Sequence, residues 1–304
     1  MKLSKGQGIA LILITACIWG FGPIFVRYFS KYLDVHTQNA FRYLSGSLSL
    51  FIIVSIFFRK ELKQCLKIWK KLFVTAFFLI IMQTFWVMAL YRVLPAFVSL
   101  IGKISIVLTV IVSFAFFPEE RESIKSAKYL FGTLLCLLGV IGVIFFKGGV
   151  TSLQMKWGII FIILANLFWT FYAVYVQKTL RNYNIVAFTP YVFAIAACSF
   201  SLMAFIKGNP LAVIHLPPRI LFTLFISGLF CIGLAHSVYY FAIRATGIAL
   251  ASSILLISPF LTAIFSYFIF GEILTAGQLI SGAVLLIGGY IVSKSKGIKH
   301  HSRS

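Results

Sequence analysis

The sequence predicts an all-α membrane protein in which ten transmembrane helices form two inverted five-helix repeats. The composition is the first observation behind this prediction: 61% of the 304 residues are hydrophobic and the mean hydropathy is +1.02. Charged residues make up 11%, against roughly 25% in soluble proteins, so a soluble domain could not bury this much apolar surface. The second observation is a series of ten apolar runs, and the third is that the two halves of the chain repeat one another.

The ten apolar runs are each near the ~20 residues that a helix needs to cross a bilayer. They lie at residues 8–29, 37–58, 72–91, 96–117, 127–146, 157–176, 185–206, 219–243, 248–270 and 274–293. The longest linker, residues 59–71, reads RKELKQCLKIWKK. Its basic residues suit one face of a helix and Leu62, Leu66 and Trp69 the other, which predicts a helix lying in the membrane interface.

The distribution of basic residues predicts the orientation. The first apolar run follows a basic start and has full length, so we expect an uncleaved first span. With the N-terminus placed in the cytoplasm, 18 of the 27 Lys and Arg residues fall in cytoplasmic segments and 7 in external ones. Cytoplasmic loops carry the excess of basic residues. We therefore expect a multi-pass protein of the cell membrane, of the bacterial inner-membrane type, with both termini cytoplasmic.

The internal repeat divides the chain at residue 150, giving a first unit at residues 1–150 and a second at 151–304. Trp19 and Trp169 stand at equivalent positions 150 residues apart, and Glu120 and Glu272 close equivalent spans 152 residues apart. Each unit has five spans, an odd number, so the second unit must be inverted relative to the first. Inverted repeats are typical of secondary transporters, which bind substrate near the midplane between the repeats.

Four motifs give the chain a resemblance to a known family. They are WGFGPIF in the first span, NAFRYLSGSLSL in the second, PEER after the fourth, and SPFLTAIFSYFIFGEILTAGQLISGAVLLIGG at the end. With these the chain resembles the EamA family of the drug/metabolite transporter superfamily over nearly its whole length. The resemblance implies ten helices in two inverted repeats and ATP-independent movement of small metabolites, often amino acids. One departure is Val107, which stands where the ninth span has Pro259 and where family members commonly have proline.

The leading functional hypothesis is therefore a secondary transporter of small organic metabolites, amino acids or other carboxylates, that works by alternating access through a central cavity. The alternatives are a membrane-embedded enzyme and a non-transporting receptor or structural membrane protein. An enzyme is disfavoured because the sequence has no HExxH, no GxSxG and no cluster of acids. No cofactor or metal site is predicted, because the five cysteines show no paired spacing and there is no GxxxxGK[ST] sequence.

Lys103 is the first candidate for substrate binding. It lies about a third of the way into the fourth span, where a charge costs ~3 kcal/mol on insertion scales and usually faces a cavity or a partner. The equivalent residue of the second unit is Leu255. Ser99 lies one turn earlier on the same face. We expect Lys103 to hold an anionic group of the substrate; the alternative is that its ammonium reaches the interface or a backbone carbonyl.

Two further ionisable residues lie inside spans. Arg42, in the second span, is expected either to join Lys103 in binding an anion or to tie helix ends together. His236, in the eighth span, is expected either to donate to substrate or exchange a proton, or to tie helices together. None of the six acids is predicted to lie centrally in the membrane, so a carboxylate-based proton relay has no obvious carrier.

Aromatic and amide side chains complete the candidate site. Trp19, Trp86, Trp169 and Tyr239 are candidates for stacking against substrate, although most aromatic residues in such a chain serve packing or interface anchoring. Asn166 is a polar group at depth beside Trp169.

Pro259 is predicted to weaken backbone hydrogen bonding in the ninth span and so to act in gating. Small residues on the fifth and tenth spans predict close packing, within each unit or at a dimer face. Glu120 and Glu272 end their spans; an interfacial salt bridge or a lock at a helix end is expected there, and cation binding is the alternative. The expected partners are a small-molecule substrate and membrane lipids, with no nucleic acid; the sequence is compatible with a monomer and with a homodimer.

Overall fold

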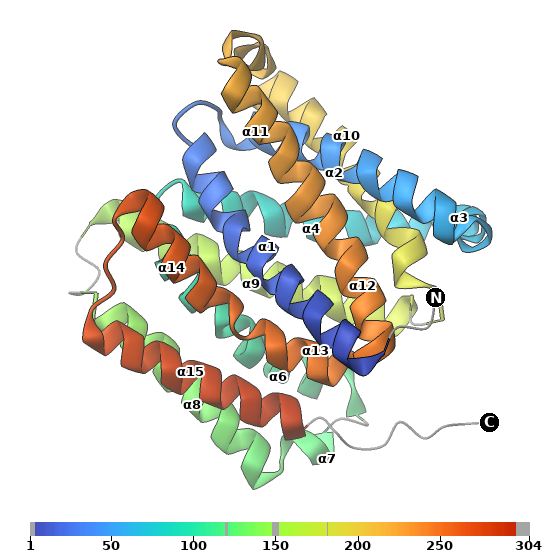
Figure 1. The fold of residues 1–304 in the computed structure, drawn as a ribbon. Helices are drawn as coiled ribbons and strands as arrows, with labels where there is room; N and C mark the ends of the chain where they lie inside the picture. Colours follow the sequence, from blue (N-terminus) through green and yellow to red (C-terminus); the bar gives the residue numbers. More distant parts are fainter. Residues whose placement is uncertain (1–3, 119–120, 148–151, 181, 296–304) are drawn as a thin grey trace.

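The fold comes from a computed structural model that describes residues 4–118, 121–147, 152–180 and 182–295, and these form helices and connecting turns (Figure 1). The first half comprises α1 (Lys5–Phe29), α2 (Val35–Phe57), α3 (Arg59–Cys65), the 3-10 turn η1 (Leu66–Ile68), α4 (Trp69–Leu90), α5 (Pro95–Ile101), the 3-10 turn η2 (Gly102–Ile104), α6 (Ser105–Phe116), α7 (Arg121–Ile124) and α8 (Ala127–Phe145). The second half comprises α9 (Leu153–Thr179), α10 (Ile185–Lys207), the 3-10 helix η4 (Pro210–His215), α11 (Pro218–Gly228), the π-helical segment η5 (Leu229–Leu234), α12 (Ala235–Thr246), α13 (Ile248–Leu255), α14 (Ser258–Phe270) and α15 (Ala276–Ser295).

Ten helical stretches of the described chain are long and apolar enough to cross a membrane, which confirms the predicted number. The third of them, Arg59–Leu90, is longer than predicted because the helix runs back through the basic linker. There α3 and η1 form the additional turns expected of residues 59–71. Side chains cap the first turns of several helices through N–H groups two or three residues later, as expected for such residues; they are Ser4, Asp34, Ser126, Ser152 and Asn184.

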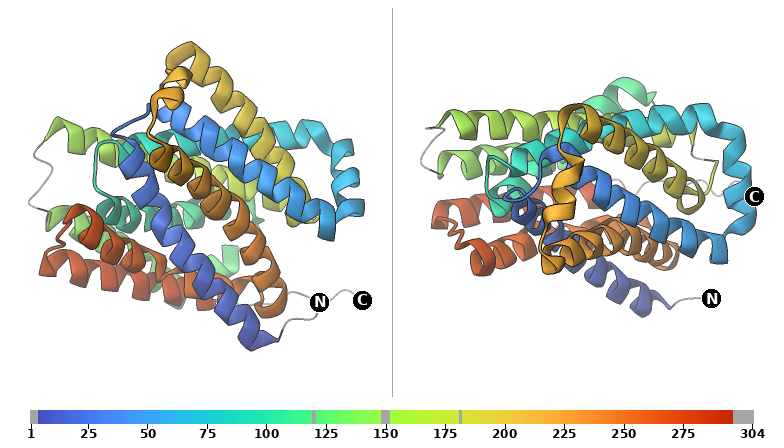
Figure 2. Two further views of the ribbon diagram at one scale, coloured as in Figure 1. Left: turned by 45° about the horizontal axis from the view of Figure 1, so that its top comes forward. Right: turned by 90° about the horizontal axis from the view of Figure 1, so that it is seen from above.

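The packing of the helices follows the repeat. The pair α1–α12 is matched by its repeat-related pair α9–α4, and the pair α1–α14 by α9–α6. In each of the pairs α2–α10 and α8–α15, the two helices are repeat equivalents of each other. Exchanging the two halves of the chain therefore leaves these pairs unchanged. Figure 2 shows α2 and α10 side by side. In Figure 1 the start of α1 and the end of α15 lie on the same side of the bundle, as an even number of crossings requires.

The small residues of the fifth and tenth spans pack the two halves against each other. A Cβ atom on Gly139 of α8 would lie 2.7 Å from the Leu285 Cα of α15, and one on Gly132 would lie 2.9 Å from the Gly288 carbonyl oxygen. These contacts correct the expectation of packing within each half or at a dimer face. The residues share one interface because α8 and α15 are repeat-related and meet face to face.

Asp34 ties the start of α2 to the distant turn before η4. Its carboxylate accepts hydrogen bonds from the N–H groups of His36, Thr37 and Asn209 and from the Thr37 hydroxyl, at 2.6–3.0 Å. Partial burial alone would raise the pKa of Asp34, but the hydrogen bonds outweigh it and hold the pKa below its usual value.

We expect Asp34→Asn to flatten the acid side of the stability profile. A depressed folded-state pKa contributes stability above the unfolded-state value of ~3.9, and this contribution is lost as the pH falls through the folded-state pKa. The wild-type protein should therefore lose stability between about pH 5 and 3 by more than the variant does. Thermal unfolding in detergent between pH 3 and 7 measures the difference, and parallel profiles would contradict the prediction.

Candidate functional site

The fourth and ninth spans are each interrupted near the middle by a short segment that is not regular α-helix, called a break below. In the fourth, α5 passes through the 3-10 turn η2 into α6; in the ninth, α13 ends at Leu255 and α14 begins at Ser258. The break at residues 102–104 corresponds to residues 254–256 at the repeat spacing, so the two breaks nearly coincide. Pro259 lies buried in the first turn of α14, where its missing N–H is tolerated. The first half forms its break without proline. A 3-10 stretch in the middle of a helix often marks a functional hinge.

Lys103 lies within the break of the fourth span and is half-buried. Among the described residues, no hydrogen bond or ion pair involves its ammonium group. Asn166 of α9 lies against the same turn: a Cβ atom on Gly102 would be 3.8 Å from the Asn166 Nδ2. Asn166 is buried and its Nδ2 donates to the Ile162 carbonyl oxygen of its own helix at 2.7 Å. Ser99 is half-buried one turn before Lys103. The structure thus places Asn166 beside the turn that contains Lys103, with Ser99 one turn earlier in the same span.

A second group of predicted residues meets where α1 crosses the eighth span. The Trp19 ring lies 5.1 Å from the rings of both His236 and Tyr239, centroid to centroid. The Trp19 Nε1 donates to the Cys231 carbonyl oxygen at 3.2 Å, and the His236 Nδ1 lies 2.7 Å from the Ile232 carbonyl oxygen. Both carbonyls belong to η5, the π-helical segment. Segments of this kind break the regular hydrogen-bond pattern and occur frequently at functional sites.

The π-helical segment was not expected from the sequence. The available signal was the glycine pair Gly228, which directly precedes the segment, and Gly233, which lies within it. A Cβ atom on Gly228 would lie 2.3 Å from the Arg42 carbonyl oxygen, and one on Gly233 would lie 3.0 Å from the Gly46 carbonyl oxygen. The glycines therefore let the eighth span approach the backbone of α2.

The Arg42 side chain faces the interface between α2 and the eighth span and not the turn that contains Lys103. Its side chain is 2% exposed, its Nε donates to the Ser227 Oγ at 3.2 Å, and its Nη1 is buried without a partner in the described chain. A buried guanidinium usually has an ion-pair partner, and none is present among the described residues. The preceding turn of α2 contributes Gln38 and Asn39, which bond to Tyr91 and Gln83 at 2.6 and 3.3 Å. Arg42 thus belongs to a buried polar cluster that the sequence did not reveal.

The two other candidate tryptophans, Trp169 and Trp86, pack elsewhere in the described structure. Trp169 is 42% exposed and stacks on Tyr172, one turn later in the same helix. Trp19, the equivalent residue of the first half, faces α12. The two equivalent tryptophans therefore make different contacts. Trp86 packs against the hydrophobic cluster formed by α4, α5 and α9, and nothing in the structure separates it from a packing residue.

Glu272 connects the end of the ninth span to the beginning of the fourth. Its side chain is 3% exposed and accepts hydrogen bonds from the N–H groups of Ala96 and Phe97. Glu272 therefore contacts the fourth span only six or seven residues before Lys103. The lock predicted for a helix end is confirmed at Glu272. Glu120, predicted to act similarly, lies outside the described residues.

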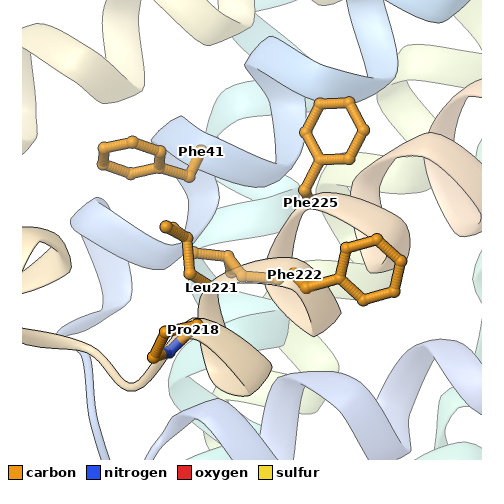
Figure 3. A pocket seen from close by; sticks show the side chains of 6 residues that line it. Phe41, Pro218, Leu221, Phe222 and Phe225 are labelled. Carbon is orange, nitrogen blue, oxygen red and sulfur yellow. The ribbon is translucent and has the colours of Figure 1, made fainter.

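An apolar groove of about 460 Å³ lies between α2 and α11 (Figure 3). It is lined by Phe41, Pro218, Leu221, Phe222, Leu224 and Phe225. None of these is a predicted binding residue, and the groove offers no polar group to orient a metabolite. No group of three or more potential metal ligands occurs among the described residues.

Comparisons with known proteins agree with the fold. A family model described as "EamA-like transporter family" matches residues 6–145 and 156–294. A protein named "Uncharacterized transporter" from Haemophilus influenzae is 26% identical over 288 residues, covering 92% of this chain and 94% of its own. A WAT1-related protein from Arabidopsis thaliana is 24% identical over 291 residues, covering 88% and 72%. A crystal structure superposes with a TM-score of 0.67 at 15% identity, covering 95% of this chain and 96% of that chain.

Proposed function

The chain belongs to the EamA-like transporter family, and from this premise we propose that it moves small carboxylate-bearing metabolites, in the first place amino acids, across the membrane. Membership makes it a membrane transporter and confirms both the resemblance drawn from its motifs and the expectation that it is not an enzyme. The substrate class, the secondary mechanism and the orientation belong to the proposal.

The observation that supports a carboxylate substrate best is the environment of Lys103. A cation lies in the 3-10 turn that interrupts the fourth span, half-buried, with no ion pair among the described residues. An unpaired ammonium in a low-dielectric setting is poorly tolerated. A substrate carboxylate would supply the missing counter-charge, and the amide of Asn166 beside the same turn would add a hydrogen-bonding group. Ser99 adds a hydroxyl on the same side.

The aromatic group supports a substrate with an apolar part. Trp19, His236 and Tyr239 present ring surfaces next to one another, and aromatic faces bind apolar groups well. The ninth span contacts the aromatic group through α14: the Thr262 hydroxyl donates to the Gly20 carbonyl oxygen at 3.1 Å, one residue after Trp19. Thr262 lies one turn after Pro259. We therefore expect a movement at the break of the ninth span to displace the aromatic group.

Alternating access is supported by the inverted packing. Exchange of two repeat-related conformations exposes a central site to each side in turn. The chain contains no GxxxxGK[ST] sequence, so we propose a secondary transporter, with both termini cytoplasmic as the 18-to-7 distribution of basic residues favours.

A thermal-shift screen of the purified protein against a metabolite panel tests the substrate class. We expect amino acids or related carboxylates to raise the unfolding temperature and their decarboxylated amines not to. Compounds that stabilise the protein are then tested for flux into proteoliposomes, with the solute recovered chemically unchanged. If uncharged or cationic solutes alone are bound and transported, the proposed substrate class is wrong.

Pro259→Ala is expected to slow transport more than it lowers expression. Alanine restores a backbone N–H and allows α13 and α14 to join into a stiffer helix, which should hinder the conformational change. Flux per mole of reconstituted protein measures the effect, with Pro210→Ala in η4 as the control outside the spans. Flux equal to that of the wild type would make Pro259 a packing residue.

A further inference from the structure

Glu272 closes a contact between two distant segments of the chain. The carboxylate accepts hydrogen bonds from the backbone N–H of Ala96 at 2.8 Å and of Phe97 at 3.1 Å, and from the Ser266 hydroxyl. Ser266 and Glu272 lie at the end of α14, whereas Ala96 and Phe97 begin α5. Glu272 and Ser266 are 3% and 0% exposed, so these bonds are shielded from water and stronger than equivalent bonds on the surface.

The beginning of α5 depends on this carboxylate. No side chain near Leu94 caps the helix, and Pro95 occupies the first turn and has no N–H. The next two N–H groups, of Ala96 and Phe97, would otherwise be unpaired. Glu272 accepts both, and its negative charge lies at the positive end of the helix dipole. A residue 175 positions away therefore takes the role that a neighbouring N-cap residue usually has.

A glycine places Glu272 for this contact. Gly271 has φ +66° and ends α14 in the left-handed conformation, where its N–H donates to the Tyr267 carbonyl oxygen at 3.0 Å. The N–H of Glu272 donates to the Ser266 carbonyl oxygen at 3.3 Å. This turn sends the chain back over the end of the helix and leaves the Glu272 side chain facing α5.

The inverted repeat shows why the contact matters for transport. At the repeat spacing, α13 is equivalent to α5 and α6 to α14. The α5 and α14 helices pack closely, but within the described part of the chain α6 and α13 do not pack in this way. The contact between the fourth and ninth spans thus differs at its two ends. It is close between α5 and α14, where Glu272 lies, and less close between α6 and α13.

We propose that Glu272 is a positioning residue of the gate: its carboxylate fastens α5 to α14 and holds the site closed at this end of the bundle. Opening at this end exchanges the three hydrogen bonds for bonds to water. The inference rests on the proposed alternating access and deepens it, because it assigns the closed end, the residue that holds it and the bonds that must break.

The test measures gate opening without any substrate. The five cysteines, Cys17, Cys65, Cys136, Cys198 and Cys231, are replaced, and Ser99 of α5, half-buried behind the gate, becomes the single reporter as Ser99→Cys. A membrane-impermeant methanethiosulfonate is added from one face of the membrane at a time, in right-side-out and inside-out vesicles. Glu272→Gln keeps the size of the side chain but cannot serve both N–H groups and the hydroxyl as a carboxylate does.

We expect Glu272→Gln to raise the labelling rate at least threefold from the face where α5 begins and to lower it from the opposite face. Ser266→Ala, which removes one of the three bonds, should change both rates in the same directions by less. Glu122→Gln removes an equal charge from an exposed position and should label at the parent rate. Size-exclusion profiles confirm that each variant is folded.

Unchanged labelling from both faces in folded Glu272→Gln would overturn the proposal. A rise from both faces would also overturn it, because it would indicate general loosening. If Glu272→Gln does not fold, labelling of Ser266→Ala decides alone. A clear shift between faces in a protein that transports no carboxylate would leave the gate standing and refute the substrate class, so the two failures are distinguishable.

Discussion

Lys103→Met is expected to weaken binding of the transported substrate at least tenfold while leaving the protein folded. Methionine keeps the length and the apolar stem of lysine and removes the charge. Tenfold weaker binding corresponds to ~1.4 kcal/mol, which is close to the lower limit of the ~1.5–3 kcal/mol typical of hydrogen bonds to charged groups. The same change should leave the unfolding temperature unchanged or raise it, because a charge that lacks an ion pair among the described residues is removed from the span.

The measurement combines affinity and stability. Thermal-shift titration with the identified substrate gives the apparent dissociation constant, and proteoliposome flux gives transport. Lys125→Met, at an exposed position outside the spans, removes an equal charge and should bind as the wild type does. Normal affinity and flux in Lys103→Met would make Lys103 a structural residue and withdraw the argument for an anionic substrate.

Gly139→Ala is expected to destabilise the protein by ~1–3 kcal/mol, the range for overpacking a close-packed contact. The added Cβ atom would lie 2.5 Å from the Leu285 Cβ and 2.7 Å from the Leu285 backbone nitrogen and Cα. The backbone of α15 would have to move, and with it the interface between the two halves. In an unstrained helix the same substitution would be favourable, because glycine is ~0.5–1 kcal/mol less stable there than alanine.

Gly6→Ala is the matched control. Nothing lies within 4 Å of the atom that it adds, and Gly6 is in the first turn of α1. We expect it to be neutral or slightly stabilising, so the two Gly→Ala changes should have opposite signs in denaturant or thermal unfolding in detergent. Equal stability of the two variants would show that α8 and α15 are not packed as the structure has them.

Much of the fold followed from the sequence. The ten spans were predictable because crossing a bilayer sets a minimum length of apolar helix, and each span satisfies it within its own residues. The inverted arrangement followed from two matching units of five spans each. The position of Pro259 at a helix break was also local, since proline cannot continue the hydrogen bonds of the preceding turn.

The candidate site was predictable only in part. Lys103 and Asn166 stand out in the sequence as polar residues at depth, and the structure places Asn166 of α9 beside the turn that contains Lys103. Trp19 and Trp169 are equivalent in the repeat, yet one contacts His236 and Tyr239 and the other stacks on its own helix. Sequence equivalence cannot distinguish them, because the difference lies in what each ring meets on another helix.

By itself, the sequence determined the membrane class, the number of spans, the duplication and the place of an unusual charge, since each depends on the composition and order of neighbouring residues. The tertiary structure alone decided that Glu272 caps α5, that Arg42 faces Ser227, that a π-helical segment meets Trp19, and that the glycines of α8 and α15 join the halves. The physical reason is the same in each case. These contacts join residues more than 140 positions apart, and only the packing of the two inverted repeats brings them within reach.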